Sequence, residues 1–275
     1  MTRHEITTDD GQSIAVRILE RPGAPVAVLL HATLSSGEQL RPLARRLADR
    51  YRVLLIDRRG TADSPMLEPA PVPVARHVAD VVEVLDAFGV DRAIVVGHSF
   101  GGVVALRLAA EHGDRVDGVV AWEPPYLPVA AARVRDGMAA LAGEMDDAFA
   151  SGGSEAAAHR FLDAVSGPGA WDRLHPRQRS SVARQGAGAL ADAAMPGLSA
   201  DGLERITAPT LIATGAASDP FYTPIADALA ERIGAAATRV GLTGLAHMAP
   251  ITDAATIADL VLRLAAAPET QETPT

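Results

Sequence analysis

Short apolar runs rich in β-branched residues recur along this chain, and segments with a helical pattern lie between them. The runs are Ser13–Leu19, Val26–Leu30, Arg52–Ile56, Ala93–Val96, Gly118–Trp122, Thr210–Thr214 and Ala237–Val240. Most are continuously apolar, which is typical of parallel strands covered on both faces. Between them, apolar residues recur at helical spacing, as in Leu40, Leu43, Ala44 and Leu47. This alternation predicts an α/β fold with a doubly wound, mostly parallel central sheet.

One long interval, residues 124–205, breaks the alternation. It contains no convincing strand, and its Ala-rich sequence is broken by Gly- and Pro-containing segments such as Ser166-Gly167-Pro168-Gly169. A compact domain rarely holds so long a stretch without structure of its own. We therefore predict a helical cap inserted over the carboxyl ends of the strands, with helices at 132–149 and 155–165. The core is then 1–123 and 206–266, and the polar tail 267–275 is expected to be disordered.

Composition excludes several classes of function. The chain has 275 residues, a net charge of −9 and no cysteine or lysine, so disulfides, thiolate nucleophiles, Schiff bases and Ser-Lys dyads are absent. The acidic balance argues against nucleic acid and anionic membranes as partners. No apolar run approaches the ~18 residues of a membrane span, and the first residues lack a signal-peptide pattern, so we expect a cytoplasmic protein. The histidines show no metal-ligand spacing, and we expect neither a metal nor an organic cofactor. The oligomeric state stays open.

The run AIVVGHSFGG ends in Ser99, which lies between glycines at the end of a predicted strand and the start of a helix. Such a serine is either a helix N-cap or a nucleophile raised on a strained turn. Two more reactive residues, Asp219 and His247, also follow predicted strands. Since sites in open α/β sheets form at the carboxyl ends of strands, we expect the three to meet there.

Five motifs occur in a characteristic order, namely LLHATLSS, DRRGTADSP, GHSFG, APTLIATGAASDPF and GLAHMAP. Together they resemble the α/β-hydrolase superfamily, in particular its serine-nucleophile branch of esterases, lipases and perhydrolases. The resemblance implies a catalytic triad of Ser99 as nucleophile, His247 as general base and Asp219 as the acid. It also implies an oxyanion hole made by the backbone N–H groups of Phe100 and Thr33, with Leu34 as the alternative to Thr33.

Glu123, in VVAWEPPYLP, is the rival acid because it also follows a predicted strand. The distance of 28 positions from Asp219 to His247 resembles the usual arrangement of the superfamily, so Asp219 is preferred. The loop residues Asp57, Arg58 and Arg59 are expected to brace the loop after their strand.

The resemblance implies hydrolysis of a small-molecule ester, lactone or related acyl substrate through an acyl-enzyme. Perhydrolysis and C–C cleavage are alternatives because they use the same groups, and a non-hydrolytic small-molecule receptor on this fold is a further one. The sequence does not identify the substrate.

Overall fold

The computed structural model describes residues 1–66 and 70–266. Within these ranges, eight strands form one sheet in the order β1-β2-β4-β3-β5-β6-β7-β8. The strands are β1 (Thr2–Thr7), β2 (Ser13–Leu19), β3 (Val26–Leu30), β4 (Arg52–Ile56), β5 (Ala93–His98), β6 (Val116–Trp122), β7 (Thr210–Gly215) and β8 (Ala237–Leu242). Only the pairs that involve β2 are antiparallel, and all other pairs are parallel. The predicted doubly wound, mostly parallel sheet is confirmed.

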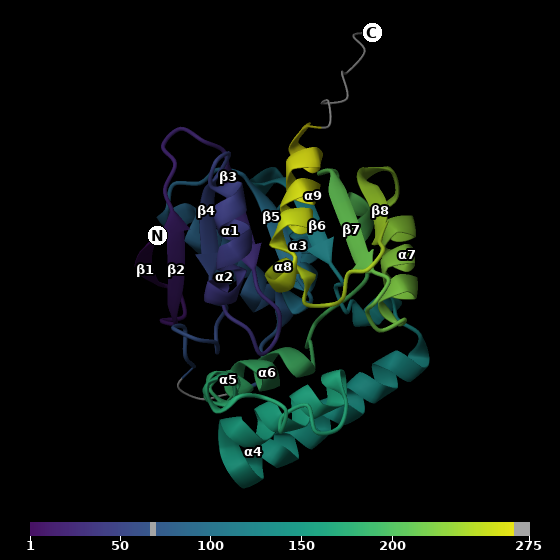
Figure 1. Cartoon of the computed structure of the whole chain (residues 1–275). Coiled ribbons are helices and arrows are strands. Elements are labelled where there is room, and N and C mark those ends of the chain that lie inside the picture. The colour runs from purple at the N-terminus through teal and green to yellow at the C-terminus, as the bar shows by residue number, and fades with distance from the viewer. Residues whose placement is uncertain (67–69, 267–275) are drawn as a thin grey trace.

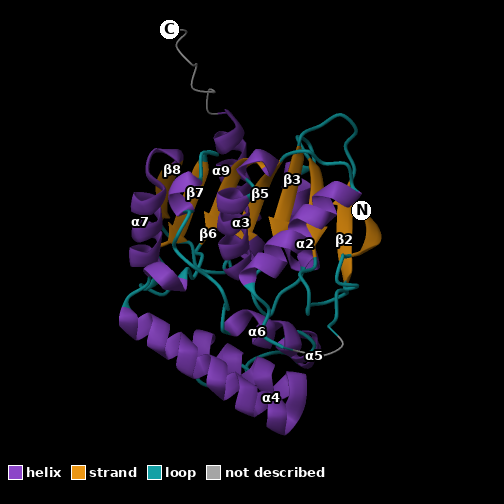
Figure 2. Ribbon diagram, turned by 180° about the vertical axis from the view of Figure 1, so that it is seen from behind, coloured by secondary structure: helices purple, strands orange, loops and turns teal. Residues whose placement is uncertain are grey.

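Helices cover both faces of the sheet (Figures 1 and 2). The helices around the sheet are α1 (Arg41–Leu47), α2 (Val74–Ala87), α3 (Phe100–Glu111), α7 (Tyr222–Ile233), α8 (Ala249–Thr252) and α9 (Ala254–Ala266). Val28 and Leu30 of β3 belong to the apolar cluster formed with α2, α3 and α7. Ala27 and Leu29 belong to the opposite cluster, formed with α1 and α9. Two covered faces explain why the strand sequences are continuously apolar.

A helical layer lies beyond the carboxyl ends of the strands, at the bottom of Figure 1. It consists of α4 (Ala132–Ser166), α5 (Pro176–Ala183) and α6 (Gly186–Ala193). Gly153 interrupts α4 with a φ of 67°, so two helices meet near the predicted break. The layer has its own apolar cluster, which includes Leu141, Met145 and Trp171. The strict division into a core and a cap at residues 124 and 205 stays a prediction.

Short 3-10 helices join the larger elements. They are η1 (Gly37–Leu40), η2 (Gly113–Arg115), η3 (Leu127–Val129), η4 (Leu203–Arg205) and η5 (Gly234–Ala236). Among the described helices, none is long and apolar enough to cross a lipid bilayer. The tail 267–275, for which disorder is predicted, lies outside the described residues.

Candidate active site

Ser99 occupies a strained turn between β5 and α3. Its φ of 53° and ψ of −121° are unusual for a residue with a side chain. Its backbone N–H donates to the carbonyl of Trp122 at 2.8 Å, which fixes the turn against β6. The hydroxyl makes no capping hydrogen bond to α3. The helix-cap interpretation of this serine therefore fails, and the geometry is that of a nucleophile elbow.

Two glycines make this turn sterically feasible. A Cβ on Gly97 would lie 2.3 Å from the carbonyl oxygen of Gly101, and a Cβ on Gly101 would lie 2.3 Å from the carbonyl oxygen of Leu30. Both distances are far below van der Waals contact, and both involve backbone atoms that cannot move aside easily. The sequence G-x-S-x-G is thus required by close backbone approach around Ser99.

The carboxylate that contacts His247 belongs to Glu123, the residue directly after β6. Its Oε2 lies 2.7 Å from His247 Nδ1. Its Oε1 accepts a hydrogen bond of 2.7 Å from the backbone N–H of Gly215 on β7. Glu123 has no exposed surface and adopts a φ of 47°. This turn at the end of β6 places the buried carboxylate between His247 and β7.

The expectation that Asp219 is the partner of His247 is corrected by this geometry. Asp219 is exposed, and its carboxylate accepts a hydrogen bond from the backbone N–H of Phe221 at 3.1 Å, just before α7. Asp219 lies four positions past Gly215, the last residue of β7, whereas Glu123 follows its strand immediately. The loop carries Asp219 outward into solvent, and the site beside the imidazole is already filled by Glu123.

The rings of Tyr222 and His98 pack against the imidazole of His247. Tyr222 stacks on it with a centroid distance of 4.9 Å and an interplanar angle of 11°. His98 lies 4.8 Å away at a tilt of 56°. The backbone carbonyl of His247 accepts a hydrogen bond of 3.0 Å from Trp122 Nε1. Sequence reasoning missed Tyr222, although its position just after the Asp219 loop places it at the carboxyl edge of the sheet.

The hydroxyl of Tyr222 lies close to both reacting side chains. It is 3.5 Å from His247 Nε2, at the limit of a hydrogen bond. Burial raises the pKa of Tyr222, the nearby carboxylates of Glu123 and Asp219 raise it further, and the Ser99 hydroxyl opposes the shift. The phenol is therefore neutral at ordinary pH. Among the hydrogen bonds of the described residues, none joins Ser99 Oγ to His247 Nε2, and such bonds are often long in substrate-free enzymes.

Backbone N–H groups without a protein acceptor occur in the loop after β3 and at the start of α3. Over residues 1–66 and 70–266, those of Thr33, Leu34 and Phe100 donate to no protein acceptor. Phe100 is the first residue of α3, so its N–H also belongs to the positive end of a helix. Leu34 has a φ of 54°, which marks the loop after β3 as strained. These groups are the candidates for an oxyanion hole, and Thr33 and Phe100 are the pair that the sequence predicts.

The loop after β3 is held by groups of the loop after β4. His31 Nδ1 lies 2.7 Å from the carbonyl oxygen of Ala32, and His31 Nε2 accepts a hydrogen bond from the N–H of Arg58 at 3.1 Å. Burial lowers the pKa of His31 well below its usual value, and the charge of Arg58 lowers it further, so the ring is neutral. Asp57 accepts a hydrogen bond of 2.7 Å from the N–H of Gly37. Asp57 and Arg58 thus hold the segment after β3, whereas the sequence predicts that they brace the loop after their own strand, β4.

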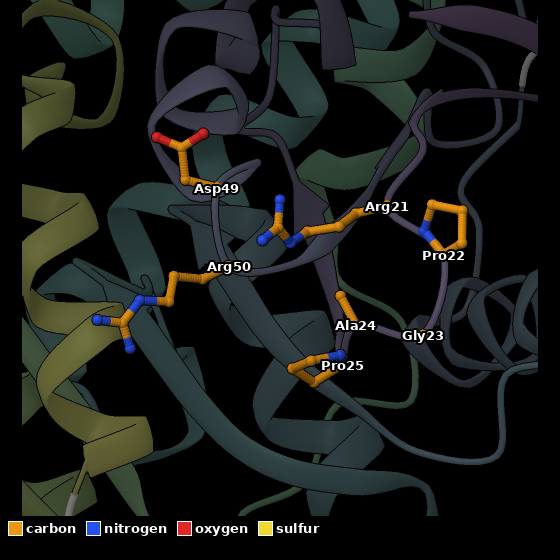
Figure 3. A pocket seen from close by; sticks show the side chains of 7 residues that line it. All are labelled: Arg21, Pro22, Gly23, Ala24, Pro25, Asp49 and Arg50. Atoms are coloured by element: carbon orange, nitrogen blue, oxygen red, sulfur yellow. The ribbon is translucent and has the colours of Figure 1, made fainter.

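Two depressions on the surface differ in their relation to this site. One of about 330 Å³ lies between the start of α4 and the start of α7, and its lining includes Arg133, Asp219 and Phe221. The other, of about 530 Å³, is lined by residues 21–25 together with Asp49 and Arg50 (Figure 3). Residues 21–25 precede β3, so this second depression lies at the edge of the sheet opposite Ser99. Neither depression is lined by Ser99, Glu123 or His247.

No metal cluster accompanies these groups. Within the part of the chain that the structure describes, no group of three or more histidine, aspartate or glutamate side chains is arranged to hold a metal ion.

Comparisons with known proteins agree with this architecture. Residues 25–151 match the family model described as alpha/beta hydrolase fold. The solved structure of a hydrolase from Pseudomonas aeruginosa PA01 superposes with a TM-score of 0.79 at 24% identity, over 96% of this chain and 98% of that one. At 24% sequence identity, this structural similarity establishes the fold alone.

Two curated relatives are similar over part of the chain. A putative carbamate hydrolase RutD from Caulobacter sp. (strain K31) is 42% identical over 102 residues, which are 36% of this chain and 38% of the relative. Epoxide hydrolase A from Mycobacterium tuberculosis is 37% identical over 123 residues, which are 43% of this chain and 38% of the relative. The matched region thus spans less than half the length of each relative.

Proposed function

We propose that this chain, which has the α/β-hydrolase fold, is a serine hydrolase of small-molecule acyl substrates, such as esters and lactones. Ser99 is the nucleophile, His247 the general base and Glu123 the acid of its catalytic triad. The observation that carries this proposal is the 2.7 Å contact between the fully buried Glu123 carboxylate and His247 Nδ1. A serine raised on the elbow without a capping role supports it.

In the acylation step, Ser99 Oγ attacks the carbonyl carbon of the substrate while His247 Nε2 accepts the hydroxyl proton. Glu123 keeps Nδ1 protonated, which leaves Nε2 free as the base, and its negative charge stabilises the imidazolium that forms. The negative charge that develops on the carbonyl oxygen is accepted by the N–H groups of Phe100 and Thr33. His247 then donates its proton to the leaving oxygen as the tetrahedral intermediate collapses, which leaves Ser99 acylated.

In the deacylation step, the same groups act on water. His247 Nε2 removes a proton from a water molecule as the water oxygen attacks the acyl carbon, and the same backbone N–H groups accept the oxyanion. Collapse releases the carboxylic acid and returns the proton to Ser99 Oγ. The cycle needs no group beyond the side chains and backbone N–H groups of this chain.

The serine at position 99 favours acyl transfer over other reactions of the fold. Epoxide hydrolases of this fold use an aspartate at the elbow, and this chain has none there. A carbamate, the substrate class in the name of one relative, is also an acyl substrate. Perhydrolysis and C–C cleavage would use the same triad with a different attacking or leaving group. A small-molecule receptor is disfavoured by a buried carboxylate on the imidazole, which binding alone does not require.

Labelling with a fluorophosphonate tests this proposal most cheaply. The expected result is a covalent adduct on Ser99, a burst of product with p-nitrophenyl acetate, and loss of both in Ser99→Ala at unchanged circular dichroism. A series of p-nitrophenyl esters of increasing chain length then defines the acyl preference. A folded protein without adduct or burst on any ester of the series would contradict the proposal and favour a binding module.

A further inference from the structure

An ion pair joins the helical cap to the loop after β4, and both of its partners are buried. Arg58 Nη1 and Nη2 each lie 2.7 Å from the carboxylate of Asp192, which belongs to α6. The side chains of both residues are 2% exposed. A buried pair of charges is costly to desolvate and is a weak source of stability. A contribution to stability therefore does not explain why this ion pair is buried between α6 and the loop after β4.

The remaining donors of Arg58 are directed at the candidate oxyanion loop. Its Nε donates to the carbonyl of His31 at 3.1 Å, and its Nη2 donates to the carbonyl of Ala32 at 3.2 Å. In a trans peptide the C=O and the N–H point in opposite directions. Donors that hold the Ala32 carbonyl thus fix the direction of the Thr33 N–H, one of the two proposed oxyanion donors.

Asp192 also contacts the loop directly. Its Oδ2 accepts a hydrogen bond of 2.8 Å from the hydroxyl of Thr33. The neighbouring side chain, that of Leu34, belongs to the apolar cluster of the cap. The Asp192 carboxylate therefore holds two groups that flank the Ala32–Thr33 peptide, namely the Arg58 guanidinium and the Thr33 hydroxyl.

The helix that carries Asp192 is itself rigidly placed on the core. A Cβ on Gly188 would lie 2.7 Å from the carbonyl oxygen of Gly60, so the two backbones are in close contact. Gln185 Oε1, at the start of α6, accepts a hydrogen bond of 2.8 Å from the N–H of Ala62. The helix that carries Asp192 is thus placed by contacts with the loop after β4, the loop that also carries Arg58.

We propose that Asp192 is a positioning residue for the oxyanion hole, contributed by the cap. Through Arg58 and the Thr33 hydroxyl it orients the Ala32–Thr33 peptide, so that the cap governs turnover as well as access to the site. This inference rests on the proposed hydrolase function, since it assigns Asp192 a role in that reaction.

The chain offers a matched control. Asp80 forms a second buried pair with the adjacent arginine, Arg59, at 2.6 and 2.8 Å. Arg59 also contacts Asp10, and no described hydrogen bond of Arg59, Asp80 or Asp10 reaches residues 31–34. Asp80→Asn therefore removes one charge from a similar pair without touching the oxyanion loop.

The test compares Asp192→Asn with Asp80→Asn by steady-state kinetics on p-nitrophenyl acetate and by hydrogen exchange of the amides of residues 33–35. For Asp192→Asn we expect kcat to fall about 10- to 100-fold with KM within about threefold, because the loss of a whole oxyanion donor costs about 100- to 1,000-fold. We also expect faster exchange of these amides. Asp80→Asn should leave both the amide exchange and kcat within about twofold of the wild type.

Thr33→Val keeps the experiment decisive if Asp192→Asn does not fold. It replaces the hydroxyl that binds Asp192 with a methyl group, and we expect kcat to fall about 3- to 10-fold with KM unchanged. Equal losses of kcat in Asp192→Asn and Asp80→Asn, or unchanged amide exchange in Asp192→Asn and Thr33→Val, would overturn the inference. Absence of any esterase activity in the wild type would instead refute the proposed function, and the exchange measurement would still test the coupling.

Discussion

The negative charge of a carboxylate with no exposed surface has to be stabilised by neighbouring groups. Both carboxylate oxygens of Glu123 have such a partner. One oxygen faces His247 Nδ1 and the other accepts the N–H of Gly215, each at 2.7 Å. Leaving such a charge unpaired in the interior costs several kcal/mol. The arrangement is therefore self-consistent only if the imidazole keeps a proton on Nδ1, which is the tautomer that a general base at Nε2 needs.

Tyr222 is expected to act through its ring more than through its hydroxyl. Tyr222→Phe keeps the ring that stacks on His247, so kcat on p-nitrophenyl acetate should stay within about threefold. Tyr222→Ala removes one wall of the imidazole site and should lower kcat about 10- to 100-fold, since small displacements of a reacting group cost that much. A Phe variant as impaired as the Ala variant would contradict this, because the hydroxyl would then be the essential group.

The side chains of the candidate site were predictable from the sequence to different degrees. Ser99 is identified by the glycines that its turn requires, because steric constraints of the backbone are local. The choice between Glu123 and Asp219 depends on how far each loop carries its residue from the strand end, which local sequence does not encode. The signal that favours Glu123 is its place directly after a strand that is buried at six of its seven residues, with two prolines following.

At the scale of the element, the strand–turn–helix unit around Ser99 should not tolerate a side chain at its glycine positions 97 and 101. Gly97→Ala places a Cβ 2.3 Å from a backbone oxygen and should lower the free energy of unfolding by about 3 kcal/mol or more. Gly137→Ala is the matched control, because Gly137 is an exposed residue of α4 with no atom within 4 Å of the added Cβ. It should raise stability by about 0.5–1 kcal/mol. Urea unfolding measures both, and a neutral Gly97→Ala would show that the turn is not sterically required.

Inner strands of the sheet were predictable from their apolar sequences, whereas the exposed edge strand β1 was not. The sequence predicts β2, β3 and β4 at their observed bounds, since each is buried by helices or neighbouring strands. It misses β1, whose residues are mostly exposed at the edge of the sheet and show no apolar pattern. Pairing with β2 places this segment, and such long-range hydrogen bonding leaves no periodic signal in the sequence.

At the scale of the whole molecule, several buried histidines make stability depend on pH. Burial lowers the pKa of His31, His77 and His98 well below the usual value, and nearby arginines lower the pKa of His31 and His77 further. Below about pH 6.5 the unfolded chain gains protons on these rings that the folded chain does not bind. Their contribution to stability is therefore complete above about pH 6.5 and is lost as the pH falls below it.

Urea unfolding between pH 7.5 and 5.0 should show this loss directly. Each such histidine contributes a slope of up to about 1.4 kcal/mol per pH unit in the acidic part of this range. His77→Leu removes one titrating ring, and the slope between pH 6 and 5 should decrease by up to that amount. An identical slope in His77→Leu and in the wild type would show that His77 does not titrate on unfolding in this range.

The central claim, that Glu123 and not Asp219 completes the triad, is tested most directly by kcat/KM of Glu123→Gln and Asp219→Asn on p-nitrophenyl acetate near pH 8. Both variants should first be checked for folding by circular dichroism. Loss of the carboxylate that orients the histidine lowers turnover about 10,000-fold in a related triad, so Glu123→Gln should approach that loss. Asp219→Asn, which changes an exposed carboxylate, should stay within about threefold of the wild type. A large loss in Asp219→Asn, whether or not Glu123→Gln is also impaired, would contradict the account.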